Sequence, residues 1–199
     1  MMNIGLTGGI ATGKSSVSAL LASKGALLID ADVIAREVMM PGHPVLAAAV
    51  QRFGQAILHE DGTLDRKKLG SIVFQHPEER RALEAITHPA IRREMRERAA
   101  AYEKAHPDKL VVSDIPLLYE SGLENGFDEV IVVYVPRAIQ RERLMSRDGL
   151  TGEQADARIA AQMDIEQKKQ LADIVIDNSG AWHDTEQQVI SFLQGKGLI

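Results

Sequence analysis

The sequence contains no cysteine among its 199 residues. This excludes disulfide bridges, thiolate metal sites and thiol nucleophiles, and it fits a reducing compartment. No apolar run approaches the roughly 20 residues that a membrane-spanning helix needs. The first residues, MMNIGLTGG, lack the pattern of a secretion signal. We therefore expect a cytoplasmic protein that does not enter membranes.

The sequence also lacks a basic surplus. Its 23 Lys and Arg residues are outnumbered by 28 Asp and Glu residues, which gives a formal net charge of -5. Binding to a nucleic-acid backbone normally needs a basic excess or a basic face, so we expect no nucleic-acid partner. With 45% hydrophobic and 26% charged residues, the chain is long enough for one globular unit. We expect a monomer or a small homo-oligomer.

Short apolar runs alternate with longer amphipathic stretches, which is typical of α/β proteins. Five runs are compact and apolar enough for strands buried on both faces of a parallel sheet. These predicted strands are Asn3–Thr7, Ala26–Ile29, Leu110–Ser113, Val130–Val135 and Asp173–Asp177. Helical spacing is present in Lys14–Ser23, Arg66–Phe74, about Glu78–Ala105, Arg137–Arg147, Thr151–Lys168 and Asp184–Gln194.

The longest helical stretch carries its apolar residues on one face. Leu83, Ile86 and Ala90 fall three or four residues apart, with charged residues between them. Pro89 lies within this pattern, and proline lacks the N–H that a helix interior needs. We therefore predict a kink or a break at Pro89, with two helices rather than one.

The segment GGIATGKS, from Gly8 to Ser15, has the phosphate-loop spacing G-x-x-x-x-G-K-[ST] and lies between a predicted strand and a predicted helix. Its glycines let successive N–H groups turn inward and approach phosphate oxygens. Lys14 adds a charge for the β and γ phosphates, and the Ser15 hydroxyl is placed to bind Mg²⁺. The predicted nucleotide-contacting residues are Gly8, Gly9, Ile10, Ala11, Thr12, Gly13, Lys14, Ser15 and Ser16.

Two aspartates, Asp30 and Asp32, follow the second predicted strand. In open α/β sheets, ligands bind beyond the carboxyl ends of the strands, where the phosphate loop also lies. Either carboxylate can accept the proton of an attacking hydroxyl group, or it can cap a helix that begins near Val33. Arg36, one turn after Asp32, is placed to pair with it or with substrate.

A third apolar run ends at Asp114, in the segment LVVSDIPLLYESG. This pattern is typical of a Walker-B aspartate, which orients Mg²⁺ or its water ligands. Strands also end in aspartate simply because that residue suits turns. Glu120 follows closely and is either a functional carboxylate or a solvated surface residue.

An arginine-rich segment follows the fourth predicted strand. Arg137 and Arg141 share one helix face, as do Arg143 and Arg147. Asp148 and Gly149 then predict a turn, and Thr151 with Gln154 predicts a capping box that opens a second helix. A helical hairpin with arginines at its hinge is either a lid over phosphates or an ordinary charged helix face.

Taken together, these segments resemble the dephospho-coenzyme A kinase family of P-loop enzymes. Matching segments run in the family's order over nearly the whole chain: LTGGIATGKS, IDADVIAREV, DGTLDRKKLGSIVF, LEAITHPAIR, DIPLLYESG, RLMSRDGLTGEQADARIAAQM and ADIVIDNSG. The resemblance implies transfer of the γ-phosphoryl group of ATP, with Mg²⁺, to the ribose 3′-hydroxyl of dephospho-CoA, in the last step of coenzyme A synthesis.

The resemblance also implies a fold and a division of the chain. The fold is a three-layer P-loop NTPase-like fold, with a small parallel five-stranded sheet flanked by helices. A nucleotide core covers about residues 1–38, 106–137 and 170–199, within a single domain, 1–199. A helical CoA-binding region covers about residues 39–105, and a lid covers about residues 138–169.

By the same resemblance, Asp32 is the general base, with Arg36 beside it. Lys14, Arg141 and Arg147 act on the transferred phosphoryl group, and Ser15 and Asp114 hold the metal. The acceptor side is formed by His88, Leu117, Leu118 and Glu120 together with Asp32 and Arg36. Asn178 lies on the adenine side, unless it is only a turn residue.

This chain departs from the family pattern at two places. Ala11 and Thr12 stand in the loop where Gly-Ser is common, which removes one flexible position but keeps the backbone N–H groups. Tyr119 stands where phenylalanine is frequent, and its added hydroxyl group needs a partner if it is buried.

Three other functions fit a phosphate loop. A kinase for another small acceptor uses the same machinery, but the segments around His88 and Pro116 argue against it. A GTPase switch is disfavoured, because neither NKxD nor a glutamine-bearing DxxG occurs. A silent nucleotide-binding protein is disfavoured by the presence of Asp32, Lys14 and the lid arginines.

Overall fold

The computed structural model describes residues 2–198 of the chain. The chain forms two compact units, one of residues 2–29 with 99–198 and one of residues Asp30–Arg98. The sequence-based division into core, CoA-binding region and lid is finer than this and stays a prediction. Its core range also includes residues 1 and 199, which lie outside the described residues.

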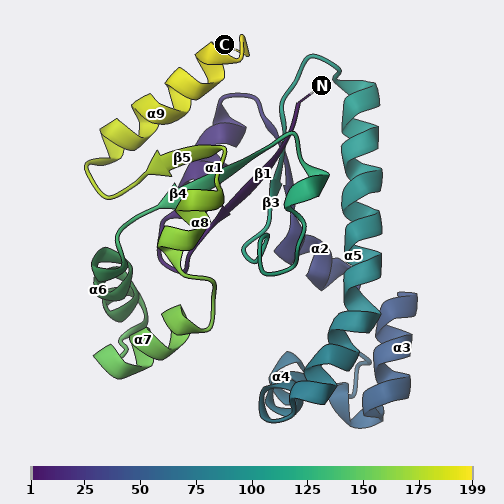
Figure 1. The fold of residues 1–199 in the computed structure, drawn as a ribbon. Coiled ribbons are helices and arrows are strands. Elements are labelled where there is room, and N and C mark those ends of the chain that lie inside the picture. Colours follow the sequence, from purple (N-terminus) through teal and green to yellow (C-terminus); the bar gives the residue numbers. More distant parts are fainter. Residues whose placement is uncertain (1, 199) are drawn as a thin grey trace. The chain divides into compact units, whose positions relative to one another are not determined.

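The first unit is built on a five-stranded parallel sheet with the strand order β2-β3-β1-β4-β5 (Figure 1). The strands are β1 (Asn3–Gly8), β2 (Leu27–Asp30), β3 (Val111–Asp114), β4 (Glu129–Tyr134) and β5 (Ile174–Asp177). Every strand was predicted to within one residue at each end, and the α/β class is confirmed. The central strand β1 pairs with β3 on one side and β4 on the other, and the phosphate-loop segment follows it directly.

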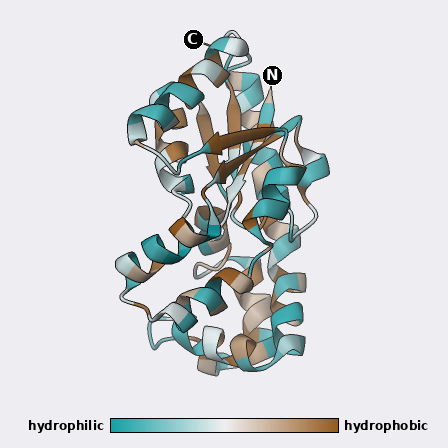
Figure 2. Ribbon diagram, turned by 60° about the vertical axis from the view of Figure 1, so that its left-hand side comes forward, coloured by the Kyte–Doolittle hydropathy of each residue, from teal (hydrophilic) through white to brown (hydrophobic). Residues whose placement is uncertain are grey.

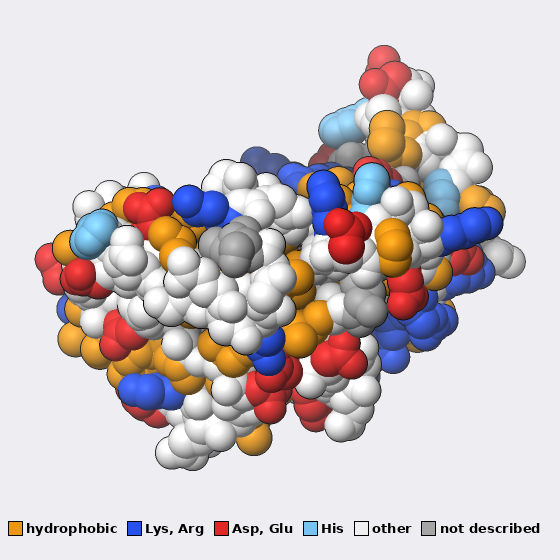
Figure 3. Space-filling model, turned by 90° about the horizontal axis from the view of Figure 1, so that it is seen from above, with side chains coloured by type: hydrophobic (Ala, Val, Ile, Leu, Met, Phe, Trp, Pro, Cys, Tyr) orange, Lys and Arg blue, Asp and Glu red, His pale blue; other side chains and the backbone are white. Residues whose placement is uncertain are grey.

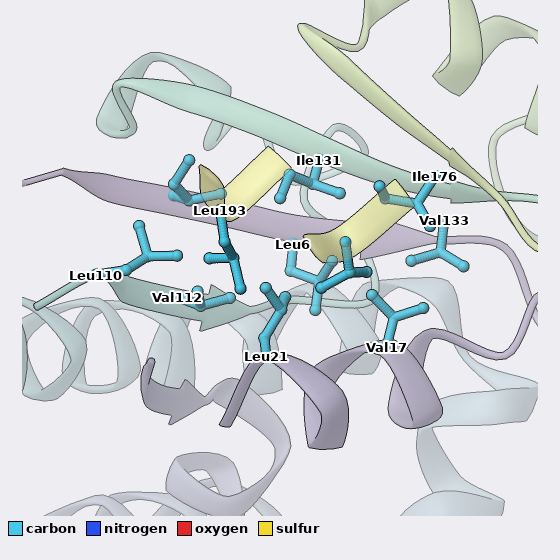
Figure 4. Close-up of a cluster of buried hydrophobic side chains, with 11 residues drawn as sticks. Leu6, Val17, Leu21, Leu110, Val112, Ile131, Val133, Ile176 and Leu193 are labelled. Atoms are coloured by element: carbon cyan, nitrogen blue, oxygen red, sulfur yellow. The ribbon is translucent and has the colours of Figure 1, made fainter. Parts of the chain in front are cut away.

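Two helices, α1 (Lys14–Ser23) and α9 (Trp182–Gly195), pack on one face of this sheet. Their apolar residues meet those of the strands in one buried cluster (Figure 4). The cluster consists of Ile4, Leu6, Val17, Leu21, Leu110, Val112, Ile131, Val133, Ile176, Val189 and Leu193. Val130 and Val132 alternate with the β4 members of the cluster, so they face the other side. There α8 (Ile165–Leu171) packs on β4.

The predicted helical hairpin is present as α6 (Arg137–Asp148) and α7 (Gly152–Ala160). Gly149 ends α6 with a φ of 65°, a left-handed conformation that glycine adopts at little cost. Thr151 and Gln154 form the predicted capping box at the start of α7. A small core of Leu144, Ala155 and Ile159 holds the two helices together.

The prediction of one helical stretch over Thr151–Lys168 was wrong, because α7 and α8 are separate helices. The turn between them is tied to other parts of the first unit. The Met163 N–H donates to Glu120, and the Gln162 side chain accepts from the Ile10 N–H. Asp164 then caps α8 by accepting from the Glu166 N–H. The spacing of apolar residues in the sequence does not reveal these contacts, because they form only in the folded chain.

The second unit is helical. It contains α2 (Ala31–Glu37), α3 (Pro44–Phe53), α4 (Arg66–Gln75), most of α5 (Pro77–Ala105) and a short 3-10 helix, η1 (Gln55–Ile57). A second 3-10 helix, η2 (Glu124–Gly126), belongs to the first unit. Helix α3, which begins at Pro44 after a His43 cap, was not predicted from the sequence. The start of α2 was predicted near Val33, two residues late.

The predicted break at Pro89 was wrong: α5 is one helix with Pro89 inside it. Proline removes one N–H donor, so it interrupts a single i to i−4 hydrogen bond. The apolar face continues beyond it, with Ala90 and Met95 buried. Helical hydrogen bonds on either side of Pro89, together with the burial of Ala90 and Met95 beyond it, therefore maintain the helix.

Hydropathy and charge follow this architecture. The strands of the sheet are hydrophobic, and the helices mix hydrophobic and polar residues (Figure 2). Acidic and basic side chains both occur across the face seen in Figure 3. Within residues 2–198, no helix is both long and apolar enough to cross a membrane.

The core cluster makes a prediction about stability. Leu193 is 2% exposed in the cluster, whereas Leu171 on α8 is 56% exposed. We expect Leu193→Ala to lower the free energy of unfolding by about 2–5 kcal/mol, because it removes buried methyl groups and leaves a cavity. The matched control Leu171→Ala should change it by less than about 0.5 kcal/mol. Denaturant unfolding followed by circular dichroism measures both, and equal losses would contradict this account of the core.

Candidate active site

The segment from Gly8 to Ser15 connects β1 to α1, as predicted for a phosphate loop. Gly13 caps α1 in a left-handed conformation, with a φ of 87°. A Cβ atom at this position would collide with the side-chain amide of Asn178, so only glycine fits. The sequence therefore places Gly13 where both the backbone and the packing require it.

Ala11 also has a left-handed conformation, with a φ of 62°, and no other described non-glycine residue has a positive φ. Such a conformation costs an L-residue roughly 1–2 kcal/mol. Ala11 and Ile10 pack against the buried core of the α6–α7 hairpin, so apolar contacts stabilise the loop where this conformation occurs. The family departure at Ala11 thus keeps the conformation that a glycine would take.

Side chains from distant parts of the chain hold the carbonyl groups of the loop. Gln140 donates to the Ile10 carbonyl at 2.9 Å, and Asn178 donates to the Thr12 carbonyl at 2.8 Å. The Lys168 ammonium donates to the Gly8 carbonyl at 3.1 Å. With its carbonyls bonded outward, the loop backbone is oriented by the rest of the first unit.

The N–H groups at the end of the loop are open. Those of Gly13, Lys14 and Ser15 have no hydrogen-bond partner within residues 2–198. They stand at the N-terminus of α1, where the helix dipole favours an anion. In contrast, the Ile10 N–H donates to the Gln162 side chain at 2.8 Å. The open group of N–H donors therefore lies around Gly13 rather than at Ile10.

Lys14 and Asp114 form an ion pair at the carboxyl end of the sheet. Asp114 ends β3 and is 5% exposed, and Lys14 begins α1. Ser15 is exposed in the first turn of the same helix. The structure thus brings together the predicted phosphate lysine and the predicted metal carboxylate, with the predicted metal hydroxyl beside Lys14 in the chain.

Two arginines of the α6–α7 hairpin are paired with carboxylates. Arg141 donates to Asp156 at 3.1 Å, and Arg147 donates to Asp148 at 2.7 Å. The hydrogen bond to Asp148 raises the pKa of Arg147. Both guanidinium groups are about half exposed, with 43% and 58% of their side-chain surface open. They are therefore held in place and reachable by an anion.

A hollow of about 500 Å³ lies between α6 and the turn after β5. It is lined by Ile139, Glu142, Arg143, Ser146, Arg147 and Ser179. Arg143 donates to the Asn178 carbonyl at 2.9 Å, which fixes the turn against α6. The Asn178 side chain itself bonds to Thr12 and to Thr185, so it positions the phosphate loop.

The predicted acceptor-side residues of the first unit differ in exposure. Leu117 is 43% exposed, whereas Leu118 is fully buried against Gly5. One oxygen of Glu120 accepts from the Met163 N–H and from the Lys168 ammonium, both at 2.9 Å. In this structure Leu117 presents a side chain to the surface, and Glu120 serves contacts within the first unit.

The other predicted site residues belong to the second unit. Asp30 caps α2 by accepting from the N–H groups of Asp32 and Val33, at 2.8 and 3.0 Å. The capping alternative for Asp30 is therefore confirmed. Asp32 and Arg36 are exposed and lie one turn apart on α2, and His88 is half-buried on α5 next to Pro89.

Sequence analysis missed the side chains that hold the loop: Gln140, Gln162 and Lys168. Two of them could have been found from the spacing of residues in the sequence. Gln140 lies one turn before Leu144 and Lys168 three residues after Ile165, so each polar residue falls on the buried face of its helix. Gln162 lies in the turn between helices, where spacing carries no such information.

The parallel sheet, the phosphate loop between β1 and α1 and the paired arginines of the hairpin define a P-loop kinase. A family model described as "CoaE: Dephospho-CoA kinase" matches residues 2–184. The chain belongs to the dephospho-CoA kinase family. Its activity is accordingly that of a phosphotransferase, dephospho-CoA kinase.

Individual relatives agree with the family model. The chain is 55% identical over 182 residues to a dephospho-CoA kinase of Anaeromyxobacter dehalogenans, covering 91% of this chain and 85% of the relative. Among solved structures, TT1252 from Thermus thermophilus has a TM-score of 0.81 and 36% identity, covering 98% and 97% of the two chains. Dephospho-CoA kinase from Campylobacter jejuni has a TM-score of 0.76 and 34% identity, covering 99% and 98%.

Tyr119 makes a prediction about its added hydroxyl group. The residue is 8% exposed, and its hydroxyl has no hydrogen-bond partner among the described residues. An unpaired buried hydroxyl costs roughly 1–3 kcal/mol. We therefore expect Tyr119→Phe to raise the free energy of unfolding by about 1 kcal/mol at neutral pH, as measured by denaturant unfolding.

The same variant has a pH signature. Burial raises the pKa of Tyr119 from 10.0 to about 12. The pKa of Tyr119 is thus higher in the folded than in the unfolded state. Below pH 10 the difference in free energy of unfolding between variant and wild type is constant, and between pH 10 and 12 wild type loses stability because only its unfolded state is deprotonated. The advantage of Tyr119→Phe should therefore grow over that range. A variant that is less stable than wild type would show that the hydroxyl has a partner.

Proposed function

We propose that this chain transfers the γ-phosphoryl group of ATP to the ribose 3′-hydroxyl of dephospho-CoA, which gives coenzyme A and ADP. In this step a bond forms between the 3′ oxygen and phosphorus, the bond from phosphorus to the ADP oxygen breaks, and the hydroxyl proton passes to a base. The observation that carries the proposal is the set of open N–H groups at Gly13, Lys14 and Ser15 in a chain of this family.

The proposed roles of the charged groups follow from their present partners. Lys14 and Arg147 are each paired with a carboxylate, Asp114 and Asp148 respectively. On binding, the phosphates replace these carboxylates as the partners of Lys14, Arg141 and Arg147. Because phosphoryl transfer depends mainly on positioning and charge stabilisation, such an exchange supplies cations where negative charge develops.

The residues present fit Mg²⁺. The Ser15 hydroxyl and the Asp114 carboxylate are oxygen ligands, and they begin α1 and end β3. No cluster of three or more His, Asp or Glu side chains suited to a metal occurs within residues 2–198. Mg²⁺ in kinases takes only one or two protein oxygens and completes its shell with phosphates and water. When bound, it neutralises charge on the β and γ phosphates.

The nucleotide base is proposed to occupy the hollow between α6 and the turn after β5. Its volume of about 500 Å³ lies in the range of small-molecule sites. Arg143 and Asn178 fix the turn that forms one wall, and Arg147 lines the hollow on the α6 side. In this proposal Asn178 lies on the adenine side and shapes the site through the turn that it helps to fix.

For the acceptor side we propose Asp32 and Arg36, at the reacting hydroxyl, and His88 in the second unit, and Leu117, Leu118 and Glu120 in the first unit. Asp32 is exposed in the first turn of α2, where it can reach a ligand, and Arg36 follows one turn later. Asp32 acts as the general base, since a carboxylate is the group that accepts the hydroxyl proton in kinases. Within this proposal, residues 39–105 bind CoA and residues 138–169 form the lid.

An acceptor panel tests the reaction. ADP release is followed with ATP, Mg²⁺ and one of four additions: dephospho-CoA, shikimate, a nucleoside monophosphate or no acceptor. We expect rapid release only with dephospho-CoA, and product analysis by mass spectrometry and ³¹P NMR should locate the new phosphate at the 3′ position. Phosphorylation of another acceptor would favour a different P-loop kinase. ATP binding without transfer to any acceptor would favour a silent nucleotide-binding protein.

Asp32→Asn tests the base. The amide keeps the size of the side chain but cannot accept the proton, so turnover should fall by a factor of roughly 10²–10⁴. Nucleotide affinity, measured by titration with an ATP analogue, should be unchanged. Asp108→Asn, at an exposed position in the first unit, is the matched control and should keep wild-type turnover. Full activity of Asp32→Asn would remove Asp32 from this role.

A further inference from the structure

Lys168 on α8 has a fully buried side chain, at 0% exposure. Its ammonium group has an acceptor for each of its donors: the Gly8 carbonyl at 3.1 Å, the Pro116 carbonyl at 3.1 Å and the Glu120 carboxylate at 2.9 Å. An ammonium group carries three N–H donors. Its hydrogen-bonding capacity is therefore used entirely within the first unit.

Burying a charge in this way is costly, so packing alone does not explain a lysine here. Removing an ammonium group from water carries a penalty of several kcal/mol, and an apolar side chain of similar volume often does as well or better. Burial lowers the pKa of Lys168, and the hydrogen bond to Glu120 opposes that shift. The Lys168 ammonium contacts three separate oxygen atoms at once, and an apolar side chain such as methionine cannot do this.

Those three oxygens belong to segments that carry the proposed chemistry. Gly8 begins the phosphate loop, and Pro116 lies two residues beyond Asp114. Glu120 also accepts from the Met163 N–H in the turn between α7 and α8. Next to Met163, the Gln162 side chain accepts from the Ile10 N–H of the loop. One ammonium group thus joins the phosphate loop, the segment after β3 and, through Glu120, the turn that follows the hairpin.

We infer that Lys168 is a positioning residue for phosphoryl transfer. It fixes the start of the phosphate loop relative to the strand end that carries Asp114, and it ties both to the turn that follows the α6–α7 hairpin. It touches no reacting atom and acts through the backbone carbonyls of Gly8 and Pro116. The inference rests on the proposed function, since the geometry that it fixes is that of the phosphate and metal groups.

The test compares Lys168→Met with Lys169→Met. Lys169 is the next residue and is exposed, with its ammonium over the Tyr134 ring. Lys168→Met replaces the apolar stem of the side chain and removes the ammonium group, with its two hydrogen bonds to carbonyls and its ion pair to Glu120. A misplacement of about 1 Å at a reacting group costs roughly 10²-fold in rate. We therefore expect the kcat of Lys168→Met to fall 10- to 100-fold, with the KM for ATP changed less than threefold, and Lys169→Met to match wild type.

Two further variants separate positioning from folding. Glu120→Gln keeps an oxygen that accepts from Lys168 and Met163, so its kcat should fall less than that of Lys168→Met. In the double variant the two losses should not add, because both act on one network. Circular dichroism and the denaturant midpoint give the folded fraction, so kcat is expressed per folded molecule. If Lys168→Met does not fold, the comparison is made with Lys168→Gln, which keeps donors for a carbonyl.

The outcomes are distinct from those of the acceptor panel. Wild-type turnover with dephospho-CoA establishes the reaction, and variants are compared only with that rate. If wild type phosphorylates another acceptor instead, the same comparison is made with that acceptor. A folded Lys168→Met whose kcat and KM for ATP lie within twofold of those of Lys169→Met would overturn the inference. So would a variant that is less stable but has wild-type kcat per folded molecule, because that result indicates a purely structural role.

Discussion

The site depends on one feature: side chains from other parts of the first unit hold the carbonyl groups of the phosphate loop by hydrogen bonds. In this chain Gln140, Asn178 and Lys168 supply those bonds from α6, the turn after β5 and α8. The loop conformation, with Gly13 and Ala11 in the left-handed region, is thereby fixed by the fold. The sheet brings these elements together around the end of β1, and the hairpin core packs on the same loop.

The charges around the loop follow a second pattern, in which three cations each have a carboxylate partner. Lys14 pairs with Asp114, Arg141 with Asp156 and Arg147 with Asp148. Such pairs keep positive side chains ordered, and their exposed members exchange partners at modest cost because surface ion pairs contribute little stability. Lys168 also has a carboxylate partner, Glu120, but its ammonium group is buried and has no access to solvent. Lys168 therefore holds the loop in place, whereas Arg141 and Arg147 have exposed side chains.

The elements that sequence predicted well are those governed by local pattern. Continuous apolar runs located every strand, the loop spacing located Gly8–Ser15, and Thr151 with Gln154 located the start of α7. The errors occurred where tertiary contacts decide. Pro89 indicated a break that the continued apolar face of α5 prevents, and the turn between α7 and α8 depends on contacts with Ile10 and Glu120. Gln162, which accepts from the Ile10 N–H, lies in a turn where spacing carries no signal, and its partner is 152 residues away in the sequence.

The central claim is that the phosphate loop is set before nucleotide binds. Crystal structures of the chain without nucleotide and with Mg²⁺ and a non-hydrolysable ATP analogue test it most directly. The account predicts that the bonds from Lys168 to the Gly8 carbonyl and from Asn178 to the Thr12 carbonyl are the same in both structures. It also predicts that the open N–H groups of Gly13, Lys14 and Ser15 contact phosphate in the second. A loop that releases Lys168 and Asn178 and refolds around the nucleotide would contradict it.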